Sequence, residues 1–312
     1  EPSNLPFAIK PTMSHLKRLR VSIIIPCTDS EVIPSILAAL RTQCDGMGLI
    51  EILVVGSDHR RLVHPEGSIR FIPTGPEAAY ASDKRNLGMQ IARGEYFLFL
   101  DDDCIPDPGW LRTLLGHLEG GKAVVGGSVR FDRKNYLQMA DNLSAFHDLL
   151  PYTSTGTRTY LATANLGVSR KVVEQVGLMP PGRNRADDLE WTQRMRAKGY
   201  ALYFEPRASI CHDPLRLDFA SVWQHWTSDA PHTLRVRLSY ANSLQTPRLA
   251  QIRSIFLWGA PLIAAWATAR TYSHWLSWRY YAHALPMVYL TKIAWCWSAF
   301  AHFPREEGWD SV

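Results

Sequence analysis

The segment from 94 to 110, GEYFLFLDDDCIPDPGW, constrains the fold of this chain more than any other. Its apolar run Tyr96–Leu100 is typical of a strand covered on both faces of a parallel sheet, and two prolines soon after it end the strand. Asp101, Asp102 and Asp103 follow directly. In open parallel sheets, ligands bind at the C-terminal ends of the strands, where these aspartates are expected to lie. Adjacent carboxylates repel each other unless a cation compensates their charge. The segment therefore indicates Mg²⁺ or Mn²⁺ carrying a phosphate, although alone it is equally typical of a solvated turn or helix cap.

Strands and helices alternate over the first 130 residues. The β-branched and apolar runs that predict strands are Val21–Cys27, Glu51–Val55, Ile69–Ile72 and Lys122–Val129. Helical spacing covers Ile33–Thr42 and Asp83–Ala92. This alternation predicts a parallel α/β sheet with right-handed crossovers. The pair Gly126 and Gly127 indicates either a close approach by a ligand or another backbone, or a simple bulge.

Composition narrows the class of protein. A chain of 312 residues that is 46% hydrophobic is long enough for one large core or two domain-sized units. Its five cysteines form no CxxC pair, which favours free thiols in a reducing compartment. The first twenty residues have no apolar signal region and are expected to form an extended basic arm. The net charge of +5 is compatible with nucleic acid, anionic lipid or a phosphorylated substrate.

The order of four motifs is more specific than any one of them. VSIIIPC, EILVVGSD, SDKRNLGMQIARGEYFLFLDDDCIPDPGWL and AVVGGSV together resemble the nucleotide-sugar half of family-2 glycosyltransferases with the GT-A fold. The stretch from ATANLGV to RASICH is similar to their acceptor half, so the resemblance covers about Val21–His212. It implies a Rossmann-like α/β fold with a mainly parallel central sheet flanked by helices. The expected regions are a basic arm at 1–20, a nucleotide-sugar half at 21–125, an acceptor half at 126–215 and an amphipathic helical region at 216–312.

The resemblance also assigns roles on the donor side. Asp101, Asp102 and Asp103 correspond to the DxD element, in which Asp103, with His212, holds Mn²⁺ or Mg²⁺ on the diphosphate and the first two approach the ribose and sugar. The family usually has a base-reading aspartate after the second strand, where this chain has Gly56, so the usual uridine preference does not carry over. Asp58 is the expected substitute. The implied nucleotide-sugar pocket contains Pro26, Cys27, Thr28, Asp58, Asp83, Lys84, Arg85 and Asn86.

A second acidic cluster opens a predicted helix that runs from Asp187 to about Gly199. Acids in a first helical turn stabilise the helix dipole without any chemistry. By the resemblance, however, Asp188 is the catalytic base, and Asp187 replaces the family's glutamate. An inverting transfer needs such a base on one side of the anomeric carbon and a cation under the leaving diphosphate on the other. The expected contacts to acceptor or diphosphate are Asn165, Arg183, Arg185, Asp187 and Trp191.

The C-terminal segment concentrates the positive charge. From Ala230 to Arg305 there are eight lysines and arginines, six tryptophans and no acidic residue. Its apolar runs Ile255–Ala269 and Tyr280–Phe303 are too short or too interrupted to indicate membrane-spanning helices. Basic residues interleaved with tryptophan favour helices that lie in the interface of an anionic membrane. An oligomer interface and a tryptophan-rich core remain alternatives.

The sequence therefore predicts a metal-dependent inverting glycosyltransferase, peripheral or monotopic at the cytoplasmic face of a membrane. It would move a sugar from a nucleoside diphosphate to a hydroxyl of a lipid or lipid-linked glycan. The rival is a non-catalytic sugar- or nucleotide-binding scaffold, which the altered positions Gly56 and Asp187 support. No nucleic-acid-binding motif is present, and IPCTDSEV lacks the glycines of a sugar nucleotidyltransferase loop. The segment WQHW does not match the QxxRW motif of processive synthases, so we expect one or a few sugars per acceptor.

Overall fold

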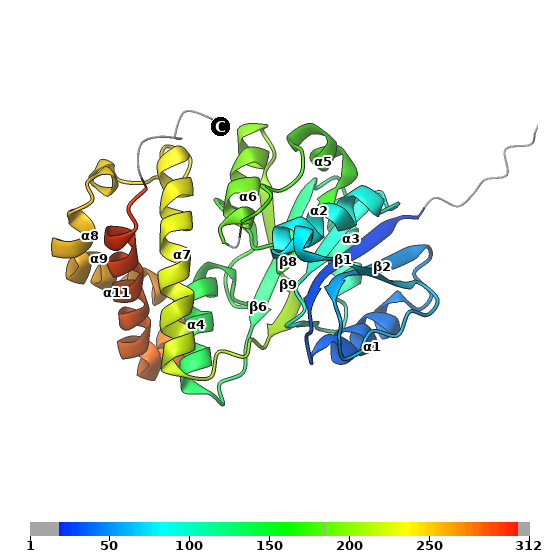
Figure 1. Ribbon diagram of the computed structural model, residues 1–312, viewed down its shortest axis with the longest axis horizontal. Coiled ribbons are helices and arrows are strands. Elements are labelled where there is room, and N and C mark those ends of the chain that lie inside the picture. Colours follow the sequence, from blue (N-terminus) through cyan, green and yellow to red (C-terminus); the bar gives the residue numbers. More distant parts are fainter. Residues whose placement is uncertain (1–18, 184, 305–312) are drawn as a thin grey trace, which may run out of the picture.

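One nine-stranded sheet forms the centre of the molecule, with strand order β3-β2-β1-β4-β8-β6-β9-β5 and β7 paired to β9 (Figure 1). The computed structural model describes residues 19–183 and 185–304, so nearly all of the expected basic arm lies outside the described residues. The strands are β1 Val21–Thr28, β2 Ile50–Ser57, β3 Ile69–Pro73, β4 Tyr96–Leu100, β5 Cys104–Pro106, β6 Val124–Arg130, β7 Gly156–Arg158, β8 Asn165–Ser169 and β9 Leu202–His212.

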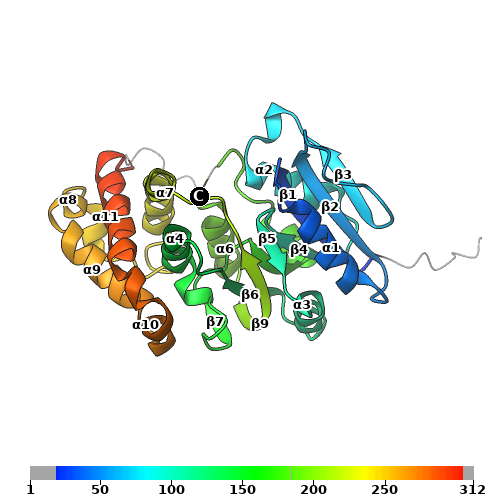
Figure 2. The ribbon, with the colours of Figure 1, turned by 90° about the horizontal axis from the view of Figure 1, so that it is seen from below.

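Helices cover both faces of the sheet and continue into a helical layer at one end (Figures 1 and 2). The helices that come before β9 in the chain are α1 Ile33–Cys44, α2 Ala81–Ile91, α3 Trp110–Glu119, α4 Tyr136–Phe146, α5 Arg170–Val176 and α6 Asp187–Ala197. The C-terminal helices are α7 Phe219–Ser239, α8 Ile255–Trp258, α9 Ala260–Thr271, α10 Trp275–Tyr281 and α11 Leu285–Ala301.

The half of the sheet made by β3-β2-β1-β4 is entirely parallel, as the alternation of strands and helices predicts. All residues of Val21–Cys27 are buried, because helices cover both faces of β1. The C-terminal ends of β1, β2 and β4 therefore lie at one edge. The backbone N–H of Thr28 donates to Oδ2 of Asp102 at 2.8 Å, which ties the end of β1 to the aspartates that follow β4.

The other half of the sheet is mixed. β8 lies antiparallel between β4 and β6, β9 is parallel to β6, and β5 and β7 are antiparallel to β9. The register of β6 against β9 shifts between Gly127 and Ser128. A Cβ atom at Gly127 would lie 1.9 Å from the carbonyl oxygen of Ala208. Among the alternatives for the glycine pair, the structure thus shows a bulge with a close approach by another backbone.

Gly56, the departure from the family pattern, has a steric explanation. Its φ angle is +143°, and a Cβ atom would lie 1.9 Å from the carbonyl oxygen of Cys27 on the neighbouring strand. An aspartate is therefore excluded from this position. The carboxylate of Asp58 accepts the backbone N–H groups of Leu62 at 2.9 Å and Val63 at 2.7 Å, so it also fixes the loop after β2.

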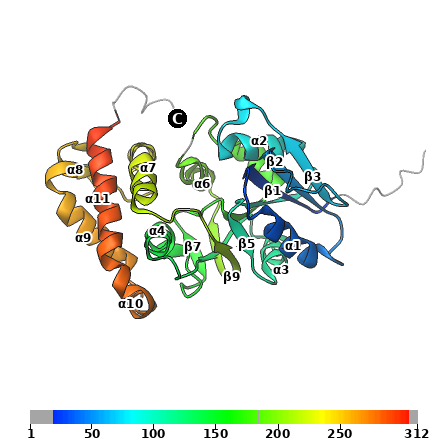
Figure 3. The same ribbon diagram turned by 60° about the horizontal axis from the view of Figure 1, so that its bottom comes forward.

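The C-terminal helices pack on α4, and α7 and α11 lie side by side next to it (Figures 1 and 3). Buried apolar side chains from these three helices form one cluster, which includes Met139, Leu143, Val222, Trp226 and Val288. Within the described ranges, no helix combines the length and the hydrophobicity that crossing a membrane requires.

Candidate active site

The three aspartates after β4 have different environments. Asp101 forms an ion pair with Arg85 of α2. Asp102 accepts the N–H of Thr28, and its pKa is raised to about 6 by burial and by the charges of its two acidic neighbours, in spite of that hydrogen bond. Burial alone would raise the pKa of Asp103, but the charges of His212 and Arg216 outweigh burial and lower it. Asp103 is therefore ionised at neutral pH.

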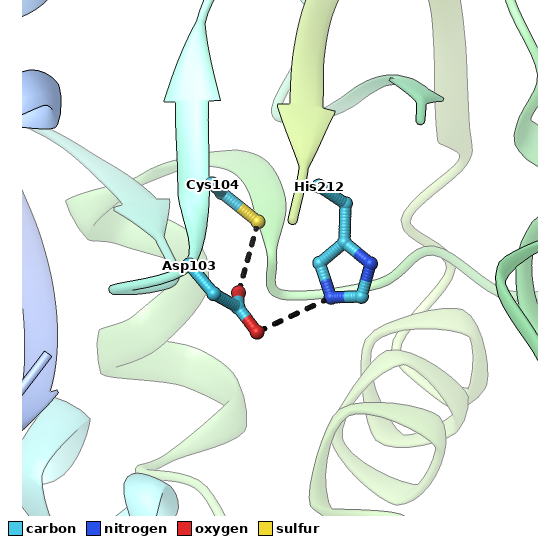
Figure 4. A group of neighbouring side chains, drawn as sticks. All are labelled: Asp103, Cys104 and His212. Carbon is cyan, nitrogen blue, oxygen red and sulfur yellow. Dashed lines mark hydrogen bonds and ion pairs between the residues drawn. The ribbon is translucent and has the colours of Figure 1, made fainter. Parts of the chain in front are cut away.

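Asp103, Cys104 and His212 form a compact group at the junction of β5 and β9 (Figure 4). Oδ2 of Asp103 lies 3.4 Å from Nε2 of His212, and the Nδ1 atom of that histidine lies 2.5 Å from Oδ1 of Asn142. In the neutral histidine whose Nδ1–H donates to Asn142, the lone pair of Nε2 faces the Asp103 carboxylate. This lone pair and the carboxylate are both acceptors, so they need a cation or a proton between them. Burial and the nearby negative charge raise the pKa of Cys104 and keep its thiol protonated. Asp103 and His212 thus fit a divalent metal as its oxygen and nitrogen ligands.

The second acidic cluster begins α6, as expected from the sequence. Ala186 precedes it with a φ of +59°, a strained conformation for a residue with a Cβ atom. Asp188 is partly exposed, and the hydroxyl of Tyr160 donates to its Oδ2 atom at 3.2 Å. Burial and the charge of Asp187 raise the pKa of Asp188 to about 7. A carboxylate with this pKa accepts a proton efficiently near neutral pH.

Arg85 joins the two acidic clusters. Its guanidinium forms ion pairs with Asp101 and with Oδ2 of Asp187, the latter at 3.1 Å, and its side chain is only 4% exposed. Asp187 is 9% exposed and is the direct neighbour of Asp188. The aspartates after β4 and the start of α6 therefore lie next to each other, although they are far apart in the sequence.

The other α2 residues assigned to the nucleotide pocket hold parts of the protein together. Lys84 is 4% exposed, and its Nζ atom donates to the carbonyl oxygen of Cys27 at 2.9 Å and to Oγ1 of Thr28 at 2.6 Å. Asn86 exchanges two hydrogen bonds of 2.9 Å with the backbone of Met179. Asp83 accepts the N–H of Gly182 at 2.8 Å. These contacts fix the end of β1 and the loop that leads to α6.

On β1, only the last of the three assigned residues reaches the surface. Pro26 and Cys27 are buried within the strand, and burial raises the pKa of the Cys27 thiol to about 11. Thr28 is exposed at the sheet edge beside Asp102. Thr28 is thus the β1 side chain best placed to contact a ligand.

Two of the residues assigned to acceptor or diphosphate are enclosed by the protein. Asn165 is 1% exposed, accepts the indole N–H of Trp110 at 2.8 Å and donates to the carbonyl oxygens of Ser128 and Ala208. Trp191 is fully buried, and its indole N–H donates to the carbonyl oxygen of Gly177 at 2.9 Å. Their positions indicate a role in packing rather than in contact with a substrate.

The two arginines of the loop before α6 differ from each other. Arg183 forms an ion pair with Glu190. Arg185 has a buried Nε atom without a hydrogen-bond partner among the described residues. Its neighbouring charges are those of Asp229, Arg216, Asp141 and Asp187.

Sequence reasoning missed Tyr160 and a group formed by Asp141, Arg216 and His225. Tyr160 is part of no motif, and nothing in the sequence around it indicates a functional role. Asp141 gave one, because it is an acid between the buried apolar residues Ala140 and Leu143 of α4. Such an acid in the buried face of a helix needs partners, and Arg216 is one of them.

The sequence and the fold of this chain are similar to those of known proteins. The model of the family described as Glycosyl transferase family 2 matches residues 22–177, which is half of the chain. The chain belongs to this family. The structure of this family-2 chain is similar to that of the mannosyltransferase PcManGT from Pyrobaculum calidifontis, solved in complex with GDP-Man and Mn²⁺. The TM-score is 0.55 at 18% identity, over 92% of this chain and 88% of that one, which confirms the GT-A fold.

Two curated relatives are similar in sequence to this family-2 chain. Glycosyltransferase AglE of Haloferax volcanii is 31% identical over 203 residues, which cover 62% of this chain and 66% of that protein. The pre-mycofactocin glycosyltransferase of Mycobacterium tuberculosis is 27% identical over 146 residues, covering 45% of this chain and 30% of that protein. The chain thus spans just under two thirds of the first relative and less than a third of the second.

Proposed function

We propose that this chain is a metal-dependent inverting glycosyltransferase that moves a sugar from a nucleoside diphosphate to an acceptor hydroxyl. The observation that carries the proposal is the Arg85 bridge, which unites the candidate metal ligands and the candidate base in one ion-pair network. Family membership and the names of the relatives support the reaction class. The Mn²⁺ in the PcManGT complex supports a divalent metal.

The residues divide the chemistry between two sides of the anomeric carbon. Asp188 takes the proton of the acceptor hydroxyl, whose oxygen then forms the new bond to that carbon while the bond to the diphosphate breaks. The diphosphate leaves with the bonding electron pair. A divalent metal held by Asp103 and His212 would supply the positive charge that stabilises it. The features that favoured a non-catalytic scaffold have structural explanations, because Gly56 excludes a side chain and Asp187 pairs with Arg85.

A screen of nucleotide sugars by thermal unfolding tests this proposal. In the presence of Mn²⁺, we expect one donor to raise the melting temperature, because a ligand that binds only the native state stabilises it in proportion to the logarithm of its concentration over Kd. UDP-, GDP- and dTDP-sugars are the probes. The stabilised donor is then incubated with Mn²⁺, and release of the nucleoside diphosphate is measured.

Asp103→Ala is the matched variant for this screen. We expect it to abolish both the Mn²⁺-dependent stabilisation and the release of diphosphate. A wild-type protein that no nucleotide sugar stabilises, with or without Mn²⁺, refutes the proposal. Stabilisation that is equal in EDTA and in Mn²⁺ refutes the metal dependence alone.

We also propose that the C-terminal helices bind an anionic membrane and that the acceptor is a lipid or lipid-linked glycan. Trp258, Leu262 and Trp266 follow one another at helical spacing and are 82%, 78% and 61% exposed. Trp275 and Trp278 on α10 are 60% and 50% exposed, whereas Trp295 packs inside the helical layer. Arg270 lies over the ring of Trp266 at 5.2 Å and Arg279 over that of Trp275 at 5.8 Å. Exposed tryptophans with basic neighbours and no acidic residue suit an anionic lipid surface.

Flotation with vesicles containing phosphatidylglycerol measures this binding. We expect the variant with serine at Trp258, Leu262 and Trp266 to bind at least tenfold more weakly, because each fully buried apolar side chain contributes roughly 1.5–3 kcal/mol. Leu49→Ser, at an exposed position outside this segment, is the control and should float like the wild type. Equal flotation of the triple variant, or no flotation of the wild type, contradicts the membrane proposal and leaves the transfer reaction untouched.

A further inference from the structure

We propose that Arg216, held in place by Asp141, is a binding residue for the diphosphate of the donor and that the segment between β9 and α7 is thereby part of the active site. This inference rests on the proposed function, since it concerns the leaving group of that reaction. It assigns a role to a charged cluster that the metal group and the base do not include.

Asp141 is the centre of this cluster. It is fully buried on α4, and three donors converge on its carboxylate. Nε of Arg216 donates at 2.7 Å, Nδ1 of His225 at 2.7 Å and Nε1 of Trp226 at 2.8 Å. Burial alone would raise the pKa of Asp141, but the hydrogen bond and charge of His225 and the charge of Arg216 outweigh burial and lower it. A buried carboxylate with this many partners is a rigid anchor.

The segment between β9 and α7 is held by hydrogen bonds to Asp103 on one side and to Gln138 of α4 on the other. These bonds place Arg216 next to the candidate metal group. The backbone N–H of Asp213 donates to the carbonyl oxygen of Asp103 at 2.9 Å. Gln138 of α4 donates to Oδ1 of Asp213 and to the carbonyl oxygen of Pro214, both at 2.7 Å. Arg216 follows two residues later. Oδ1 of Asn142, the residue after Asp141, lies 2.5 Å from Nδ1 of His212, so the anchor of Arg216 adjoins this group as well.

The free end of Arg216 suits an anion. Only its Nε atom is engaged by Asp141, and neither Nη group has a hydrogen-bond partner within the described ranges. The side chain is 24% exposed, so solvent reaches it. A guanidinium that is fixed at one nitrogen presents its remaining N–H groups in a planar fork, which matches two oxygens of a phosphate or diphosphate. Asp141 is then a positioning residue, and Arg216 is the residue that touches the ligand.

Inorganic pyrophosphate tests this assignment, because it represents the leaving group without the unidentified base and sugar. Isothermal titration measures the binding of Mn²⁺ alone and then of pyrophosphate to the Mn²⁺-saturated protein. We expect Arg216→Gln to weaken pyrophosphate binding at least tenfold with unchanged affinity for Mn²⁺. Arg216→Lys keeps the charge but not the fork, and it should lie between Arg216→Gln and the wild type. Arg112→Gln, at an exposed position of α3, removes the same charge and should bind like the wild type.

Double variants separate positioning from packing. If Asp141 acts through Arg216, the single variant Asp141→Asn binds pyrophosphate more weakly than the wild type. The double variant should then bind it no more weakly than Arg216→Gln alone. If the losses from the two substitutions add, this inference is wrong. It is also wrong if the wild-type protein binds pyrophosphate and Arg216→Gln binds it equally well. Neither result affects the proposed function. A wild type that binds no nucleotide sugar instead overturns the proposed function. A melting curve of each variant confirms that it is folded.

Discussion

Replacing Asp188 by asparagine is expected to lower the rate of sugar transfer by about 10²–10⁴-fold, the usual contribution of a general base. Asparagine keeps the size of the side chain and its hydrogen bond with Tyr160, but it has no basic oxygen for the hydroxyl proton. Steady-state kinetics with the donor found in the nucleotide-sugar screen measure the change. Donor binding, measured by titration, should stay within about twofold, because the expected metal ligands are untouched.

The pH profile gives an independent test of the same residue. Because the pKa of Asp188 lies near 7, the carboxylate is ionised above this pH, and kcat should fall about tenfold per pH unit below it. The Tyr160 hydroxyl stabilises the ionised form, so Tyr160→Phe raises the pKa and moves the acid limb to higher pH. Tyr203→Phe on β9 is the control and should keep the wild-type profile. An unchanged limb in Tyr160→Phe, or normal turnover in Asp188→Asn, contradicts the assignment of the base.

The elements that sequence reasoning located best are those buried on both faces. β4 begins and ends at the expected residues, because an uninterrupted apolar run followed by charge has one simple explanation. β8, by contrast, was missed. Its five residues, NLGVS, show no alternation and include a glycine, and the strand is defined by antiparallel pairing with β4 and β6 rather than by its own pattern.

The site was predictable where the signal is local and not where it depends on distant contacts. The acids after β4 and at the start of α6 stand out because strand ends and helix starts can be recognised from neighbouring residues. The sequence placed Arg85 near the nucleotide, but its ion pair with Asp187 joins residues 102 positions apart. The pair of Asp141 and Arg216 spans 75 positions. No periodicity reports such pairs, because they form only when the sheet is complete.

The Arg85 bridge also leads to the largest expected loss of stability. Arg85→Met should lower the free energy of unfolding by about 3–5 kcal/mol, because removing one partner of a buried ion pair leaves the other charge uncompensated. Asp187, whose side chain is 12% exposed, is the carboxylate most affected, and its pKa, already raised by burial, should rise further without the arginine. Urea unfolding followed by circular dichroism measures the change.

Two further variants show whether the lost positive charge causes the lower stability of Arg85→Met. Arg93 also pairs with a buried carboxylate, Glu51, but that carboxylate keeps the Arg70 guanidinium and the Arg93 backbone N–H as partners, so Arg93→Met should cost less than about 1 kcal/mol. In the Arg85→Met background, Asp187→Asn removes the uncompensated charge, and the double variant should be more stable than Arg85→Met alone. If the two substitutions instead destabilise additively, Arg85 contributes through packing. The two acidic clusters would then be held together by the surrounding sheet and α2 rather than by the ion pair.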